Sequence, residues 1–234
     1  MSNFELVVSA RDGGSFSAYV AGSENRDTAV VLILQEIFGV NANIRGVADE
    51  FAALGYIAVA PDLFWRQAPG LQLNPASEGD RDRAMALMQK TDESLAVEDV
   101  LATIDAANTL PGASGKVGVV GYCFGGRLAF LLSTYPQVNV AVSYYGTGLH
   151  QKLGLATEIK ARLLVHVARN DHLCPPEAQA KIEETLAPFA NNVTVMFYND
   201  AGHAFARNGA ATFVAEASER ANAATYAALG SALR

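Results

Sequence analysis

The segment Val117-Gly118-Val119-Val120-Gly121-Tyr122-Cys123-Phe124-Gly125-Gly126 decides the fold. It predicts an apolar strand that passes into a helix through a turn, with one glycine two residues before Cys123 and another two residues after it. This is the spacing of a nucleophile elbow, G-x-nucleophile-x-G. Side chains that flank so tight a turn would collide, so glycine is needed on both sides and the strained central residue points above the sheet. Cys123 also lies at the start of the helix, where partial positive charge favours a thiolate.

Two other glycine-rich motifs do not fit this segment. A P-loop needs lysine and then serine or threonine after the last glycine, where Arg127 and Leu128 stand. A dinucleotide fingerprint needs G-x-G-x-x-G, whereas the glycines here fall at positions 118, 121, 125 and 126. Most free cysteines are small buried hydrophobic residues, and the elbow spacing is what argues against that interpretation of Cys123.

Strands and helices alternate on both sides of the elbow. The first two expected strands form a hairpin through Asp12-Gly13-Gly14, and a stretch with two prolines and two glycines, 64–79, is expected to be a long surface loop. The expected strands cover 4–8, 15–20, 29–34, 56–60, 116–120, 138–143, 162–167 and 192–197. The expected helices cover 43–54, 81–89, 93–109, 125–134, 176–186 and 211–229.

This alternation predicts an α/β fold whose mainly parallel central sheet is flanked by helices on both faces and preceded by an antiparallel hairpin. We find no internal repeat, linker or compositional break, so we expect a single domain over residues 1–234. Half of the residues are hydrophobic and 18% are charged, which excludes a disordered or low-complexity protein.

Charge, apolar runs and cysteine usage narrow the class of protein further. The net charge of −7 provides no broad basic surface for nucleic acid. The apolar runs are strand-sized, far below the roughly 18 residues of a membrane span, and no signal peptide is recognisable at the start. Cys123 and Cys174 are too few for a disulfide framework. We therefore expect a protein of the reducing cytoplasm with no nucleic-acid or membrane partner, and we expect it to be a monomer.

A thiol nucleophile usually needs a base, and the chain offers four histidines. His166 lies inside an apolar strand and is expected to be a satisfied core residue, while His150 lies in a glycine-flanked loop. His203 follows the last strand, at the sheet edge where loops after parallel strands meet and ligands bind. We therefore expect His203 to be the base, with His172 as the alternative.

Asp171 is the expected acid partner of this histidine. It follows a strand, and the chain order Cys123, Asp171, His203 is the nucleophile–acid–histidine order of the α/β-hydrolase triad, which predicts that fold. Asp62 precedes the nucleophile, which is the wrong order, and Asp200 is too close to the histidine in sequence. Both are expected to cap or solvate turns.

Six short motifs, in the same order over nearly the whole chain, resemble the dienelactone hydrolase (carboxymethylenebutenolidase) family. They are Gln35-Glu36-Ile37-Phe38-Gly39, Ala60-Pro61-Asp62-Leu63, Gly121–Gly126, Tyr144-Tyr145-Gly146, Asn170-Asp171-His172 and Gly202–Arg207. The resemblance implies a cysteine–histidine–aspartate triad that opens a small anionic lactone through an acyl-enzyme, without metal or cofactor.

The resemblance also implies roles for residues outside the triad. Glu36 would assist deprotonation of the thiol and pair with Arg207 in the resting state. Arg81 and Arg207 would hold the substrate carboxylate, although Arg81 could equally be one charge in a solvated run. The backbone N–H groups of Ile37 and Phe124 would form the oxyanion hole.

Tyr145, in the Tyr-Tyr-Gly motif, is expected to contact the substrate. The resemblance implies a pocket wall on the helix after Arg81, where aromatic residues are common in the chlorocatechol-pathway enzymes. This chain has Met85 and Met88 there, so the preferred lactone or ester is left open. Cys174 has no elbow and is expected to pack.

Two alternatives to lactone hydrolysis remain. One is an esterase or thioesterase of the same fold that acts on a neutral substrate. The other, from a different class, is a non-catalytic α/β protein whose Cys123 senses oxidants, for which the aspartate and histidine in triad order would be superfluous.

Overall fold

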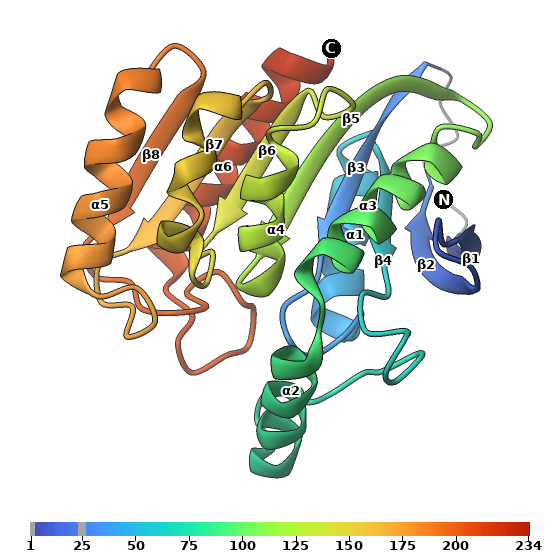
Figure 1. The fold of residues 1–234 in the computed structure, drawn as a ribbon, viewed down its shortest axis with the longest axis horizontal. Coiled ribbons are helices and arrows are strands. Elements are labelled where there is room, and N and C mark those ends of the chain that lie inside the picture. The colour runs from blue at the N-terminus through green and yellow to red at the C-terminus, as the bar shows by residue number, and fades with distance from the viewer. Residues whose placement is uncertain (1–2, 23–26) are drawn as a thin grey trace. The chain divides into compact units, whose positions relative to one another are not determined.

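The computed structural model describes residues 3–22 and 27–234 (Figure 1). The chain divides into two compact units, of which the first ends at Val117 and the second runs from Gly118 to Arg234. Each unit combines strands with covering helices. The expectation of a single domain over 1–234 stays a prediction.

The first unit opens with the antiparallel hairpin that the sequence predicts. Its turn places Gly13 and Gly14 at φ values of 100° and 85°, a region that glycine enters without strain. β1 and β2 pair antiparallel, β2 and β4 pair antiparallel, and β3 and β4 pair parallel. In order across the sheet, the strands are β1 (Asn3–Ser9), β2 (Ser15–Ala21), β4 (Ile57–Pro61) and β3 (Thr28–Leu34).

Each helix of the first unit begins after a side chain that caps it. Asn41, Ser77 and Asp92 accept hydrogen bonds from backbone N–H groups of the first turn, which satisfies donors that the helix itself leaves free. Figure 1 shows α3 in front of the strands of this unit and α1 behind them. The helices are α1 (Ala42–Ala53), α2 (Glu78–Lys90) and α3 (Glu93–Ala107).

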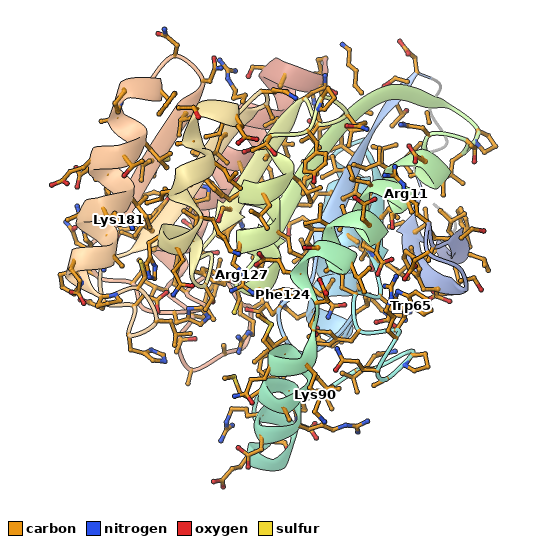
Figure 2. The ribbon with its side chains drawn as sticks, viewed as in Figure 1. Arg11, Trp65, Lys90, Phe124, Arg127 and Lys181 are labelled. Atoms are coloured by element: carbon orange, nitrogen blue, oxygen red, sulfur yellow. The ribbon has the colours of Figure 1, made fainter. Side chains whose placement is uncertain are left out.

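The long loop between β4 and α2 is held by buried carboxylates. Asp62 accepts hydrogen bonds from the N–H groups of Phe64 and Gly70, at 3.0 and 2.7 Å. Asp99 of α3 accepts one from Trp65 Nε1 at 2.9 Å, and Trp65 lies at the side of the unit in Figure 2. Asp62 therefore organises a turn, as the sequence predicts.

The second unit contains the parallel strands and the helices that follow the elbow. All neighbouring strand pairs in it are parallel. In order across the sheet, they are β5 (Ala113–Tyr122, whose first residues belong to the first unit), β6 (Val140–Tyr144), β7 (Arg162–Ala168) and β8 (Val193–Tyr198). The α-helices are α4 (Phe124–Leu132), α5 (Pro176–Leu186) and α6 (Ala215–Leu233). Three short 3₁₀ helices, Leu149–Gln151, Leu153–Glu158 and Ala187–Phe189, were not predicted.

Helices cover both faces of the sheet in the second unit. Tyr144 of β6 bonds Thr225 of α6 on one face, at 2.7 Å. The preceding residue, Ser143, points to the other face, toward α4. A Cβ at Gly126 of α4 would lie 3.1 Å from Ser143 Oγ. In Figure 1, α4 and α5 accordingly lie in front of these strands and α6 lies behind them.

The last helix begins four residues later than expected. The sequence pattern predicted its start at residue 211, but the N–H of Val214 donates to the carbonyl of Phe205 at 3.0 Å. This bond folds the preceding loop back on itself and delays helix formation. Among the described residues, no helix combines the length and the apolar character that crossing a membrane requires.

His166 is the satisfied core histidine that the sequence predicts. Its side chain is fully buried, and its ring nitrogens lie 2.8 Å from Tyr198 Oη and 3.0 Å from Thr225 Oγ1. Burial lowers the pKa of His166 to about 3, because no carboxylate compensates the charged form.

We predict a contribution of His166 to acid sensitivity. Between pH 6.5 and about 3 the unfolded state binds a proton at this histidine that the folded state excludes, so the free energy of unfolding falls as the pH falls through that range. Urea unfolding at a series of pH values measures this dependence. In His166→Gln, the free energy of unfolding should fall less steeply, by an amount that corresponds to about one proton fewer bound on unfolding. An unchanged dependence in the variant would show that other groups cause it.

Candidate active site

Cys123 occupies a strained turn between β5 and α4. Its backbone adopts φ 56° and ψ −111°, a left-handed conformation that a residue with a Cβ rarely enters. The surrounding backbone holds it there: the N–H of Cys123 donates to Tyr144 at 3.0 Å, and its carbonyl accepts from Arg127 and Thr147 at 3.2 and 3.1 Å. The strain is therefore fixed by three hydrogen bonds at the residue itself.

The glycines around Cys123 are required by close backbone approach. A Cβ at Gly121 would lie 1.9 Å from the carbonyl oxygen of Gly125, and one at Gly126 would lie 2.6 Å from that of Tyr144. No side chain fits at either distance. Figure 2 shows Phe124 and Arg127 together at the end of α4 that follows the turn, and the Arg127 guanidinium lies 5.5 Å from the centre of the Phe124 ring.

The structure brings the three expected triad residues together within the second unit. His203 Nε2 lies 3.2 Å from Cys123 Sγ, and His203 Nδ1 lies 2.8 Å from Asp171 Oδ2. The other carboxylate oxygen of Asp171 accepts the N–H of Leu173 at 2.8 Å, which fixes the orientation of the carboxylate. The arrangement is a continuous chain from carboxylate through imidazole to sulfur, the geometry of nucleophilic catalysis.

Hydrogen bonds also join the loops that carry Asp171 and His203. The N–H of Asn170, the residue before Asp171, donates to the carbonyl of Ala201 at 2.9 Å. The side chain of Asn170 donates to the carbonyl of Asn199 at 3.1 Å. Directly after His203, Ala204 adopts φ 61°, a second strained position beside the site.

The charge of His203 is set by its two partners. Burial alone lowers its pKa, because its side chain is only 12% exposed, but the hydrogen bonds to Asp171 and Cys123 outweigh burial and raise the pKa to about 10. The imidazole therefore carries two ring protons at neutral pH. It then has one N–H for the carboxylate and one for the sulfur.

Aromatic rings surround the histidine. Tyr145 meets His203 edge-on with ring centres 5.2 Å apart, and its backbone N–H donates to the carbonyl of His166 at 2.9 Å. His172, the alternative base, lies with its ring centre 6.1 Å from that of His203 and does not replace it in the chain of hydrogen bonds. Tyr122 stacks on Tyr144 at 4.7 Å, consistent with its expected packing role.

Thr147 is a residue at the site that the sequence analysis did not identify. Its Oγ1 lies 3.1 Å from Cys123 Sγ. The residue immediately follows the Tyr144-Tyr145-Gly146 motif, but a threonine in a loop carries no signal of its own. Only the folded chain reveals this contact.

Cys174 is buried, as expected for a packing residue. Burial, with smaller effects of Asp171 and Glu177, raises its pKa to about 11, so its thiol stays protonated at neutral pH. Its backbone N–H donates to the carbonyl of Asp171 at 3.1 Å. Among the residues that the structure describes, no group of three or more histidine, cysteine, aspartate or glutamate side chains has the arrangement of a metal site.

The remaining expected site residues are divided between the units. Glu36 is buried at 2% exposure, two residues after the end of β3, and is followed by Ile37. Arg81 is exposed, and its guanidinium donates to the carbonyls of Pro75 and Ala76, at 3.0 and 3.1 Å. Arg207, in the second unit, is half-buried in the loop that carries His203. Their roles stay predictions.

Comparison with known proteins identifies the family over most of the chain. Residues 16–233 match the model of the dienelactone hydrolase family. Carboxymethylenebutenolidase from Pseudomonas putida is 41% identical over 218 residues, which cover 93% of this chain and 92% of that protein. Carboxymethylenebutenolidase 1 from Cupriavidus pinatubonensis is 35% identical and is covered to 93%, with 94% of this chain aligned.

The solved structures identify the fold. The crystal structure of a proposed dienelactone hydrolase from Klebsiella pneumoniae superposes with a TM-score of 0.83 at 23% identity, covering 98% of this chain and 99% of that one. Strand pairing within each unit agrees with the α/β-hydrolase fold that the sequence predicts. The chain is therefore a hydrolase that belongs to the dienelactone hydrolase family.

Proposed function

We propose that this protein opens a small anionic lactone, similar to a dienelactone, through a thioester with Cys123. The observation that carries the proposal is the chain of contacts from Asp171 through His203 to the Cys123 sulfur, at 2.8 and 3.2 Å. The lactone as substrate class is supported by carboxymethylenebutenolidases that are 41% and 35% identical to this chain. A reactive thiol also fits the reducing cytoplasm as its location.

The reaction begins with attack of the Cys123 thiolate on the lactone carbonyl carbon. A C–S bond forms, and the carbonyl electron pair moves to oxygen. When this oxyanion collapses, the ring C–O bond breaks, and the His203 imidazolium protonates the departing oxygen, which stays attached to the opened chain. The neutral imidazole then takes a proton from water, whose oxygen attacks the thioester, and the C–S bond breaks to release the acid and the thiolate.

The developing oxyanion needs hydrogen-bond donors. Phe124 is the first residue of α4, where backbone N–H groups point out of the helix end and the dipole favours negative charge. We assign its N–H to the oxyanion hole, together with the N–H of Ile37 that the family resemblance implies.

The family resemblance also supplies the contacts to the substrate. We assign Arg81 and Arg207 to the substrate carboxylate, because a guanidinium can hold a carboxylate through two parallel hydrogen bonds. Glu36 would assist deprotonation of the thiol, and in the resting state it would pair with Arg207. Tyr145, whose ring lies 5.2 Å from that of His203, would contact the substrate beside the base.

The first prediction concerns the nucleophile. Cys123→Ala should lower kcat/KM for a carboxylated lactone by at least about a thousand-fold, because no other group can form the thioester. Cys174→Ala should retain nearly full activity, since that thiol is buried and stays protonated. Mass spectrometry of the enzyme trapped with a slow ester should show the acyl group on Cys123; substantial turnover by Cys123→Ala would disprove the assignment.

The second prediction concerns the charge of His203. With its pKa raised to about 10, the ring should stay doubly protonated through pH 8 and lose a proton as the pH rises through about 10. The stability that this charge contributes is fully present below about pH 6.5 and is lost as the pH rises to about 10. Ring ¹⁵N NMR shifts of His203, recorded against pH, measure the titration directly.

Asp171→Asn is the matched variant for this measurement. It should move the His203 titration to lower pH and reduce kcat by roughly a hundred-fold to ten-thousand-fold, because the carboxylate no longer stabilises the imidazolium or selects its tautomer. A variant with the wild-type kcat would show that another carboxylate orients the base, and Glu36 would be examined first.

The third prediction concerns the charge of the substrate. Arg81→Ala should weaken kcat/KM for a carboxylated lactone by about ten- to a hundred-fold, since a charge-assisted bond contributes roughly 1.5–3 kcal/mol. Hydrolysis of a neutral aryl ester of similar size should barely change, and this ester is the control. Equal slowing of both substrates would show that Arg81 is structural, in line with its bonds to the carbonyls of Pro75 and Ala76.

A further inference from the structure

We propose that the hydroxyl group of Thr147 is a second hydrogen-bond donor to the Cys123 thiolate, which it positions and stabilises together with His203. Thr147 Oγ1 lies 3.1 Å from Cys123 Sγ, and His203 Nε2 lies 3.2 Å from the same sulfur. The inference deepens the proposed function, because it concerns the same nucleophile.

Thr147 is attached to the elbow at two points. Besides the hydroxyl contact, its backbone N–H donates to the carbonyl of Cys123 at 3.1 Å. The same carbonyl also accepts from Arg127, so the threonine shares an acceptor with the first turn of α4. Two attachments to one strained residue leave the hydroxyl little freedom to move away from the sulfur.

The glycines on either side of Thr147 allow this close approach. A Cβ at Gly146 would lie 2.6 Å from Ser143 Oγ and 3.0 Å from the carbonyl carbon of Gly126. Gly148 adopts φ 75°, which would strain any other residue. Thr147 therefore stands between two glycines in a segment that packs against the elbow.

The charge of the sulfur determines the direction of the hydrogen bond, because a thiolate can only accept. Among the residues that the structure describes, Cys123 Sγ is the one partner of the Thr147 hydroxyl. A hydroxyl can donate to a thiolate, whereas it gains little from an uncharged sulfur, which is a weak acceptor. The bond is therefore strongest when Cys123 is a thiolate, before it attacks the lactone and again when it leaves the thioester.

The test is a pH titration of the Cys123 thiolate by its absorbance near 240 nm, in the full-length protein. The Cys123→Ala form of each variant is the blank, and it removes the signal of Cys174. Thr147→Val should move the midpoint of the titration upward by about one pH unit, as expected for loss of one hydrogen bond to a charged group. Thr147→Ser, which keeps the hydroxyl, should restore it.

Thr194→Val is the matched control, because Thr194 is exposed on β8 and the same methyl-for-hydroxyl exchange there should leave the midpoint unchanged. If Thr147→Val does not fold, Thr147→Ala provides the same comparison with Thr147→Ser. A midpoint in the valine or alanine variant within about 0.2 pH unit of the wild type would overturn the proposal.

The outcome separates this inference from the proposed function. The titration needs no substrate, so a shifted midpoint in a protein that hydrolyses no lactone would support the role of Thr147 and reject the substrate class. Lactone hydrolysis with an unshifted midpoint would support the substrate class and reject the role of Thr147.

Discussion

The contact between two stretches of backbone at the end of β5 constrains everything else in the site. A Cβ at Gly121 would lie 1.9 Å from the carbonyl oxygen of Gly125, so no side chain fits there. This close approach of backbone makes the turn short enough to hold Cys123 at φ 56°. The strained cysteine in turn offers its carbonyl to Thr147 and its sulfur to His203. A wider turn would remove the strain, and with it the position of the thiol.

Two histidines in the second unit show how the environment determines the charge of an imidazole. His166 and His203 are both surrounded by aromatic rings and largely withdrawn from water. His166 faces two hydroxyl groups and stays neutral, whereas His203 faces a carboxylate and a sulfur and becomes charged. The same side chain is therefore neutral in one place and charged in the other, because a carboxylate and a sulfur outweigh the effect of burial at His203 and no such partner does so at His166.

Much of the architecture follows from local patterns in the sequence. The apolar runs and their spacing predict the strands and the α-helices, and the glycine spacing predicts the elbow at Cys123. Asp171 and His203 could be chosen because each follows a strand whose end faces the same sheet edge. Thr147 and the delayed start of α6 could not, because both depend on contacts between segments distant in sequence: Thr147 with Cys123, and Val214 with Phe205. Sequence patterns of period two or 3.6 carry no information on such contacts.

The bonds from Asn170 to Ala201 and Asn199 have a consequence for the motions of the site. They join the two loops just before Asp171 and His203, so the motions of these two side chains are coupled through the backbone. Thermal fluctuations that separate the imidazole from its carboxylate must first break this junction, and its local free energy of opening limits how often the pair is out of register.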